Sequence, residues 1–194
     1  IDVYSVIDAC NSQPFSHIHQ PGIAVGGHCI PIYPRMYLWN DPTATVVRAA
    51  REANAAMPSY AVDTLEANHG SLSNQRVVVM GAAYRGGVKE TAFSGVFATV
   101  EALKDKNAIV YVNDPMYSNE ELTNLGFVPY NVGDGIDAAI IQANHTEYKS
   151  LKASDLPGVR TVLDGRRVLD SQNFANVTVI EIGVSQSSLY IESN

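Results

Sequence analysis

The spacing of apolar residues changes near residue 70, and this change divides the chain into two regions. Before it, apolar side chains recur at helical spacing, first over 1–12 and then over 42–69. After it, short runs rich in β-branched residues alternate with helical segments. The pattern therefore predicts a helical region at 1–70, followed by an α/β region at 71–194.

The helical region contains two expected helices. The first ends before Pro14, because the residue before a proline avoids helical geometry. Asp41 and Pro42 have the residue types of a helix cap and a first helical position, so the second helix is expected to run from Pro42 to His69. Pro58 is expected to break or bend it. A helix this long favours a scaffold or self-association element, but a packed pair of helices explains the pattern as well.

The α/β region begins after 70–75, whose glycine, serine and asparagine residues are typical of a linker. Strands are expected at 76–81, 109–113, 127–131, 137–143, 160–164 and 177–182. Helices are expected at 94–105 and 119–125. Strands that alternate with helices form right-handed βαβ crossovers. The expected fold class is therefore α/β, with a Rossmann-like, mostly parallel sheet and flanking helices.

The composition narrows the class of protein. Of the 194 residues, 46% are hydrophobic and 17% are charged, which is typical of a globular protein. The net charge of -7 disfavours nucleic acid or an anionic membrane as the main partner, although a local cationic cluster can still bind one anionic nucleotide. There is no apolar run of about 18 residues, and the first residues lack the basic region of a signal peptide. With too few cysteines for a disulfide framework, a cytoplasmic location with reduced thiols is expected.

One cysteine lies in a segment rich in glycine and proline, 20–34. Gly22, Gly26 and Gly27 permit positive φ angles and close contact with a ligand, and the prolines stiffen the flanks. Such a segment would hold the thiol of Cys29 in a defined position, as a nucleophile requires. An ordinary turn with a half-buried cysteine explains the same spacing.

Two cationic segments follow predicted strands, and ligands of such sheets bind beyond the carboxyl ends of the strands. The segment 81–94 places Arg85 and Lys89 among glycines near a helix start, which suits phosphate oxygens although no G-x-G-x-x-G is present. Arg166 and Arg167 form a second candidate anion site. The alternatives are a solvated basic loop for the first segment and pairing with nearby aspartates for the second.

Four residues that lie close together in the sequence are of types that bind metals: His17, His19, His28 and Cys29. Their spacing matches no zinc motif, so no metal site is expected. His28 is expected instead to shape the loop or to influence the neighbouring thiol.

Four segments, in the same order, resemble motifs of the UDP-glucose/GDP-mannose dehydrogenase family. The run PGIAVGGHCIPIYPRMYL, 21–38, resembles the family's cysteine loop PGxGVGGHCIPVDPYYL, in the form found in the branch that oxidises UDP-N-acetylmannosamine. The segment 81–94 is similar to GLAYKxDxxDTRESP, Asn113-Asp114-Pro115 to YDP, and 163–170 to a stretch containing DGRRVLD. The resemblance covers nearly the whole chain.

The resemblance implies an NAD-dependent oxidation of a UDP-sugar alcohol to a uronic acid for polysaccharide biosynthesis, with Cys29 as the nucleophile that forms a thiohemiacetal and then a thioester. The substrate-binding residues that it implies are Gln20, Gly22, Val25, Gly26, Tyr84, Arg85 and Arg166. The cofactor contacts that it implies are Cys29, Ile30, Pro31 and Ile32. The expected partners are the UDP-sugar and a second copy of the chain, in a homodimer built around 42–69.

The chain departs from the family pattern at two positions of chemical interest. Tyr33 stands where the family has an aspartate, and Ala92 stands where it has a cofactor-contacting arginine. The family's NAD-binding domain would precede Ile1, so we expect a C-terminal fragment: part of the central helical domain at 1–70 and the UDP-sugar-binding domain at 71–194. Such a fragment should bind a UDP-sugar without turning over NAD. The alternatives are a non-catalytic nucleotide-sugar-binding or dimerisation module, and a hydrolase or transferase that pairs Cys29 with His28 or His17.

Overall fold

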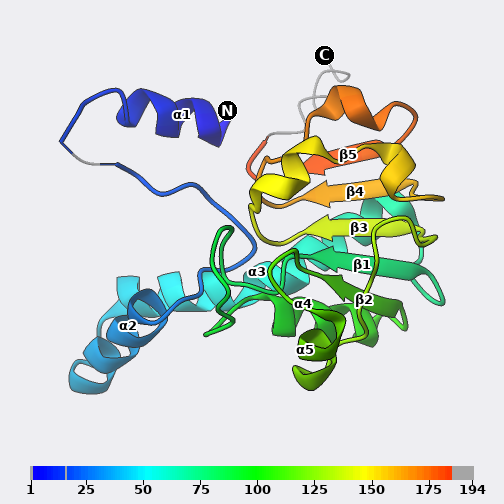
Figure 1. Cartoon of the computed structure of the whole chain (residues 1–194). Coiled ribbons are helices and arrows are strands. Elements are labelled where there is room, and N and C mark those ends of the chain that lie inside the picture. Colours follow the sequence, from blue (N-terminus) through cyan, green and yellow to red (C-terminus); the bar gives the residue numbers. More distant parts are fainter. Residues whose placement is uncertain (1, 16, 185–194) are drawn as a thin grey trace, which may run out of the picture.

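The computed structural model describes residues 2–15 and 17–184. A single sheet of parallel strands has the order β2-β1-β3-β4-β5 (Figure 1). The strands are β1 (Arg76–Met80), β2 (Ile109–Asn113), β3 (Ala138–Ile141), β4 (Thr161–Asp164) and β5 (Thr178–Glu181). The chain moves outward from β1 to β2 and returns to β3 on the other side of β1, so a topological switch point lies between β1 and β3. The predicted α/β, Rossmann-like fold is confirmed.

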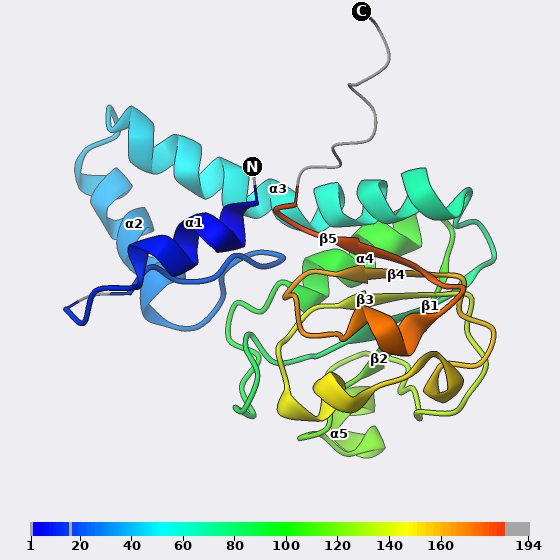
Figure 2. The ribbon, with the colours of Figure 1, turned by 90° about the horizontal axis from the view of Figure 1, so that it is seen from above.

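Alternate residues of the strands enter two separate hydrophobic cores, one on each face of the sheet. Val77 and Val79 of β1 belong to the first core, while Val78 and Met80 belong to the second. Helices α3 (Thr45–His69) and α4 (Val96–Asp105) cover the first face (Figure 2). The second face is covered by loops and three short 3-10 helices: η1 (Thr146–Ser150), η2 (Ala153–Asp155) and η3 (Ser171–Phe174). Burial on both faces explains why the inner strands β1, β3 and β4 are mostly apolar.

Helix α3 is one uninterrupted helix that extends beyond the sheet. It begins at Thr45, with Ala44 as its cap, so the predicted start at Pro42 with Asp41 as cap is wrong. Asp41 instead bonds to Thr43 in a turn before the helix. Pro58 lies inside the helix without breaking it, and it is buried at the start of the half that packs on the sheet. The first half projects away from the sheet beside α2 (Cys29–Asn40) (Figures 1 and 2).

Helix α2 was not predicted, because its prolines are typical of a loop. The glycine-rich loop ends at His28, and Cys29 is the first residue of the helix. Pro31 lies in the first turn, where backbone N–H groups have no partner inside the helix and a proline costs little. Pro34 lies further in, where it removes one helical hydrogen bond.

Residues 127–131 do not form the expected third strand. They contribute a single bridge, between Val112 and Pro129, at the edge of β2. Proline has no N–H group to donate, so the ladder does not continue through this position. The described residues therefore contain five strands rather than six. The helices expected at 94–105 and 119–125 are confirmed as α4 and α5 (Asn119–Asn124).

The first helix, α1 (Val3–Cys10), is confirmed within the predicted segment and docks near the end of β5. The amide of Val3 donates to the carbonyl of Gly183, and Tyr4 and Ile7 are buried. The linker at 70–75 is also packed, since Leu72 is fully buried. In the described part of the chain, the helices are too short or too polar to cross a membrane.

Candidate functional site

The glycine loop, residues 20–28, lies across the carboxyl end of the sheet. The carbonyl of Ile23 accepts a hydrogen bond of 2.7 Å from the side-chain amide of Gln142, which follows β3. The side chain of Ile23 is 1% exposed and fits against Gly165, where a Cβ atom would lie 2.6 Å from Ile23 Cδ1. The loop is therefore held in the α/β region by buried contacts of both its backbone and its side chain.

The glycines of this loop make close contact with other parts of the protein. A Cβ atom on Gly26 would lie 2.6 Å from Tyr84 Cβ and 2.7 Å from the carbonyl oxygen of Phe93. Gly27 has a φ of +89°, faces the ring of Tyr84 and donates to the carbonyl of Ala92 at 2.8 Å. Larger residues would separate the loop from the segment after β1. The structure thus brings the predicted residues Gly26 and Tyr84 together.

Arg166 lies against the start of the same loop. A Cβ atom on Gly22 would lie 2.3 Å from Arg166 Nη1, so only glycine permits this approach. Burial lowers the pKa of the Arg166 guanidinium, while Tyr4 and Asp164 act in the opposite direction; an arginine nonetheless stays charged in a protein. Its Nε atom is buried and has no hydrogen-bond partner among the described residues. A buried donor of this kind points to a ligand or water that completes the site.

The two arginines after β4 have separate roles. The carboxylate of Asp164 accepts hydrogen bonds from the backbone amides of Arg166, Val168 and Leu169, at 2.8–3.0 Å. Arg167 pairs with Asp2 and Glu181, each at 3.1 Å. The suggestion that both arginines pair with neighbouring aspartates is therefore wrong. Within the described chain Arg166 has no ion-pair partner and remains available to an anion.

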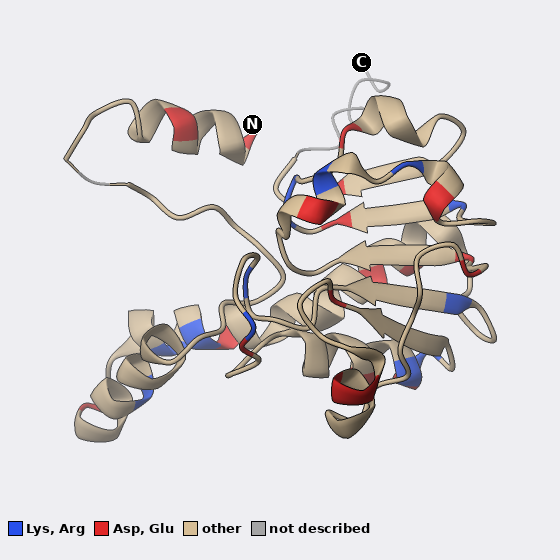
Figure 3. Cartoon of the chain, in the orientation of Figure 1, with Lys and Arg blue, Asp and Glu red and all other residues tan. Residues whose placement is uncertain are grey.

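A polar cavity of about 450 Å³ opens beside Arg166. Its lining residues come from the glycine loop and from the segments after β1, β3 and β4: Gln20, Gly86, Gly87, Asn144, Thr146, Lys149, Arg166, Arg167 and Val168. Figure 3 shows basic residues in the turns after β1 and β4, although acidic residues outnumber basic ones in the whole chain. The cavity lies at the carboxyl ends of the strands, where ligands of this fold bind.

The segment after β1 supplies two cations: Arg85, which donates to the carbonyl of Gly86 at 3.4 Å and forms no ion pair with a described residue, and Lys89, which does form one. Arg85 is exposed, and its guanidinium carbon lies 5.8 Å from the centre of the Tyr84 ring. Lys89 forms an ion pair with Glu121 of α5, so the predicted pair of phosphate-binding cations reduces to Arg85.

Cys29 is exposed at the amino end of α2. Ile30 is also exposed, Ile32 is half-buried and Pro31 is buried. Val25 and Pro31 line a second cavity of about 360 Å³ that shares no residue with the cavity beside Arg166. Val25 bonds through its amide to Asn54 of α3, at 2.8 Å. The structure therefore does not bring Val25 into the Arg166 cavity.

The loop residues around Cys29 contact the segment after β1. His28 lies 3.5 Å from the carboxylate of Glu90. A hydrogen bond from the amide of Ala92 outweighs burial and, with His28, lowers the pKa of Glu90. Tyr33 is 63% exposed. Across the described residues, His, Cys, Asp and Glu side chains form no group of three or more that could hold a metal ion.

Comparisons with known proteins agree with this geometry. A model of the UDP binding domain of the UDP-glucose/GDP-mannose dehydrogenase family matches residues 78–174, which is half of the chain, and a model of the family's central domain matches residues 1–56. The chain belongs to this family. The two matched segments meet at the site, since the loop that carries Cys29 comes from the first and Tyr84, Arg85 and Arg166 come from the second.

Several relatives in the UDP-glucose/GDP-mannose dehydrogenase family resemble most of this chain. The UDP-N-acetyl-D-mannosamine dehydrogenase of Methanococcus vannielii is 30% identical over 181 residues, which cover 91% of this chain and 41% of that protein. The structure of the corresponding enzyme from Pyrococcus horikoshii is 29% identical, with a TM-score of 0.78, over 94% of this chain and 44% of that one. A UDP-glucose dehydrogenase structure from Pyrobaculum islandicum, 24% identical with a TM-score of 0.80, shares the fold. The chain spans about two fifths of the curated relatives that it matches.

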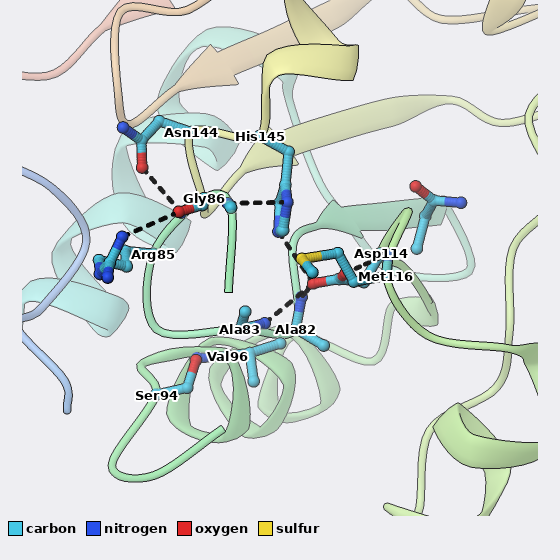
Figure 4. Close-up of polar contacts among 12 residues, drawn as sticks. Ala82, Ala83, Arg85, Gly86, Ser94, Val96, Asp114, Met116, Asn144 and His145 are labelled. Atoms are coloured by element: carbon cyan, nitrogen blue, oxygen red, sulfur yellow. Dashed lines mark hydrogen bonds and ion pairs between the residues drawn. The ribbon is translucent and has the colours of Figure 1, made fainter. Parts of the chain in front are cut away.

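The structure also reveals site residues that the sequence analysis of this family member did not identify. Asp114 was matched only to the family's YDP motif, and His145 was not considered, but the two form a buried pair with a separation of 3.1 Å (Figure 4). Burial raises the pKa of Asp114, but the hydrogen bonds from His145 and from the amides of Ala83 and Met116 lower it by more, so the pKa of Asp114 lies below its usual value. Asn144 and Lys149, which were also missed, line the cavity beside Arg166, whereas Asp114 and His145 lie outside its lining. The signal that could have found them is position, since all of them follow predicted strands.

Proposed function

We propose that this chain carries the UDP-sugar-binding region and the nucleophilic cysteine of an NAD-dependent nucleotide-sugar 6-dehydrogenase. Its substrate would be a UDP-sugar of the N-acetylmannosamine type, oxidised at C6 to the uronic acid. The observation that carries the proposal is the cationic cavity beside Arg166, which Gln20 of the glycine loop also lines. Relatives named UDP-N-acetyl-D-mannosamine dehydrogenase support the choice of sugar.

The charges around the cavity suit a diphosphate. Lys149, Arg166 and Arg167 all line it. Arg166 is the best placed of the three, because its buried Nε atom lacks a partner in the described chain and a guanidinium can form two parallel bonds to a phosphate. Arg167 is already paired with two carboxylates. Tyr84 and Arg85 would contact the sugar nucleotide from the segment after β1.

Cys29 would perform the covalent step. Its thiolate would add to the carbonyl carbon of a C6 aldehyde to give a thiohemiacetal, and the thioester formed on further oxidation would be hydrolysed by water. Cys29 is exposed at the amino end of α2, a position that favours negative charge such as a developing oxyanion. Tyr33 stands at the position of the family's aspartate, so the chain has no carboxylate there to act as a general base.

NAD would accept the hydrides in this reaction. The described residues do not fit a complete NAD site, because the turn after β1 lacks the dinucleotide fingerprint and Ala92 offers no guanidinium to a pyrophosphate. Contacts from this chain would be limited to Cys29, Ile30, Pro31 and Ile32. We therefore propose that NAD is bound mainly outside this chain, and that the chain alone binds a UDP-sugar without reducing NAD.

A homodimer remains part of the proposal. Exposed apolar side chains gather on α2 and on the first half of α3: Ile30, Tyr33, Met36, Tyr37, Trp39 and Val46. Such a surface is typical of an interface. Analytical ultracentrifugation should give a dimer, and a monomer at all protein concentrations would contradict this part. The cytoplasmic location expected from the sequence also stays a prediction.

Calorimetric titration of the chain with UDP and with UDP-N-acetylmannosamine tests the binding proposal. Both ligands should bind. Arg166→Gln should weaken the binding of UDP by about tenfold or more, because it removes a charge-assisted hydrogen bond. Arg48→Gln is the matched control, since Arg48 is exposed on the projecting half of α3. Equal UDP affinity in the wild type and Arg166→Gln, or no binding by the wild type, would overturn the proposal.

The covalent step is tested in the full-length protein. NADH formation from the UDP-sugar should be lost in Cys29→Ser while UDP binding is kept, and mass spectrometry should detect a thioester on Cys29 of the wild type. Tyr33 and Ala92 favour a second candidate, a non-catalytic nucleotide-sugar-binding module. A full-length protein that binds the UDP-sugar but forms neither NADH nor the thioester would support that second candidate.

A further inference from the structure

The turn that carries Tyr84 and Arg85 is anchored by a buried pair, Asp114 and His145 (Figure 4). Asp114 follows β2 and is 2% exposed, while His145 follows β3 and is 0% exposed. They therefore lie on either side of β1, since β2 and β3 are its two neighbours in the sheet. The turn after β1 leaves the sheet between them.

Asp114 and His145 form hydrogen bonds with the turn on both sides of Tyr84 and Arg85, its two candidate substrate contacts. One carboxylate oxygen of Asp114 accepts from the amides of Ala82 at 2.9 Å and Ala83 at 3.0 Å. On the far side, the amide of Gly87 donates to His145 Nδ1 at 3.5 Å. The neighbouring Asn144 side chain accepts from the amide of Gly86 at 2.9 Å. Backbone amides on both sides of Tyr84 and Arg85 are thus held by side chains that follow β2 and β3.

The bonds of His145 assign its tautomer. Nδ1 accepts from Gly87, so the ring proton lies on Nε2 and is donated to Asp114. The ring of Tyr148 meets the imidazole edge-on, and its hydroxyl donates to Asn113 at 3.1 Å. Packing and hydrogen bonds therefore fix both the position and the orientation of His145. His145 itself does not line the cavity beside Arg166.

We propose that His145, held by Asp114, is a positioning residue for the UDP-sugar site. It keeps the turn at 81–87, whose Gly86 and Gly87 line the cavity, in one geometry before the ligand arrives, so that binding carries no cost of ordering the turn. The inference rests on the proposed function for its ligand, but the fixed geometry of the turn is a property of the free protein and is measurable without a ligand.

Two substitutions distinguish the two hydrogen bonds of His145, one to Asp114 and one to the amide of Gly87. His145→Ala removes both, whereas His145→Gln supplies an amide that can still donate to Asp114 but offers no acceptor at the position of Nδ1. Thr161→Val is the matched control. Thr161 is 3% exposed, and its hydroxyl forms a hydrogen bond of 3.1 Å with His69. It lies at the amino end of β4, whereas the turn lies beyond the carboxyl ends of the strands. The control loses one buried side-chain bond far from the turn.

UDP affinity by calorimetry, melting temperature, and amide exchange at Gly86 and Gly87 should be measured for each variant. We expect His145→Ala to weaken the binding of UDP by about tenfold, and His145→Gln to weaken it by about threefold to fivefold. In both variants, amide hydrogen exchange at Gly86 and Gly87 should be faster. Thr161→Val should lower the melting temperature without changing UDP affinity. An affinity within twofold of the wild type in a folded His145→Gln protein, with unchanged glycine exchange, would overturn the proposal.

The design distinguishes failure of this inference from failure of the proposed function. If the wild type does not bind UDP, the proposed function fails, and the positioning role is decided by amide exchange alone. If the wild type binds UDP and His145→Gln changes neither affinity nor exchange, only the positioning role fails. Should His145→Ala not fold, His145→Gln still decides the outcome, because it retains the bond to Asp114.

Discussion

At the scale of single residues, the glycine loop contains one strained position. Ala24 has a φ of +65°, in the left-handed region that disfavours residues with a Cβ atom. The motif of the UDP-glucose/GDP-mannose dehydrogenase family has glycine at this position. The neighbouring loop is fixed by the bond between Ile23 and Gln142, so Ala24 cannot relax without breaking buried contacts.

Replacing Ala24 by glycine should therefore stabilise the protein. The expected gain is about 0.5–1 kcal/mol, because relief of the left-handed strain exceeds the entropy that glycine adds to the unfolded chain. Urea unfolding monitored by circular dichroism measures it. Ala98→Gly is the control, since Ala98 is exposed inside α4 and its replacement should cost about 1 kcal/mol. A loss of stability in Ala24→Gly would contradict the prediction.

Ionisation of Asp114 should make the free energy of unfolding depend on pH in the acid range. Its pKa in the folded protein lies below the usual value of 3.8, so its ionised form stabilises the fold fully above that value, and this contribution disappears as pH falls through the folded pKa. Asp114→Asn should be less stable than the wild type by about 1–3 kcal/mol at pH 6. The difference should shrink below about pH 4. Denaturant unfolding from pH 7 to pH 3 tests this, and a constant difference would refute it.

At the scale of elements, the end of β1 lies unusually close to the end of β3. Gly81 has a φ of +111°, and a Cβ atom there would lie 2.4 Å from Ala143 Cβ and 2.7 Å from Ala143 N. Any larger residue would push the two strand ends apart at the topological switch point. The turn that carries Tyr84 begins at this position, so the spacing of the strands sets the position of the site.

Gly81→Ala should consequently destabilise the fold by more than about 3 kcal/mol, from the combined cost of a steric clash in the core and a strained φ angle. Gly133→Ala is the matched control, because its φ of +106° is similar but nothing lies within 4 Å of the added Cβ atom. The difference between the two variants in thermal or urea unfolding isolates the steric part. Equal losses of stability would show that strand spacing is not restrictive here.

The elements also show where sequence reasoning succeeds. The inner strands β1, β3 and β4 were predictable because almost all of their residues are buried, which favours apolar and β-branched side chains. The edge strands β2 and β5 are only partly buried, but they are also rich in β-branched residues. Helix α2 was not, since Pro31 and Pro34 are typical of a loop and only the surrounding structure reveals that the first turn tolerates a proline. The false strand at 127–131 followed from its aromatic and β-branched residues, and Pro129 limits it to one bridge.

The candidate site could be predicted in part. Glycines 22, 26 and 27 were singled out for positive φ angles and ligand contact, but only Gly27 has a positive φ, and the three glycines contact Arg166 and Tyr84 of the same chain. The pairing of Asp114 with His145 was invisible, since 31 residues separate them and only the order of the strands brings them together. The resemblance had already given Arg166 alone as a substrate contact, and the structure adds the physical difference, since Arg167 is paired with Asp2 and Glu181.

At the scale of the whole molecule, the expected boundary near residue 70 separates a helix from the sheet that it covers. Ala61, Val62 and Leu65 of α3 are fully buried in the core formed with β1 and α4. The division into 1–70 and 71–194 remains a prediction, but a chain cut there would lose this cover. A cut near residue 56, before the packed half of α3, would keep it.

A fragment of residues 71–194 should therefore be less stable than a fragment of residues 56–194. The expected difference is roughly 5 kcal/mol, the cost of exposing two large aliphatic side chains and the surface that they cover. Thermal unfolding of the two fragments measures the difference. Equal melting temperatures would show that the sheet does not depend on α3, and that residue 70 is an adequate boundary.

Helix α3 joins two surfaces that differ in character. One half is packed on the sheet whose carboxyl end bears the cavity, and the other carries the exposed Val46 beside the exposed apolar side chains of α2. The helix is continuous through Pro58, so one element joins the core of the sheet to the outer surface. A second molecule bound to the outer half would therefore contact the same helix that covers the sheet, next to α2, which begins at Cys29.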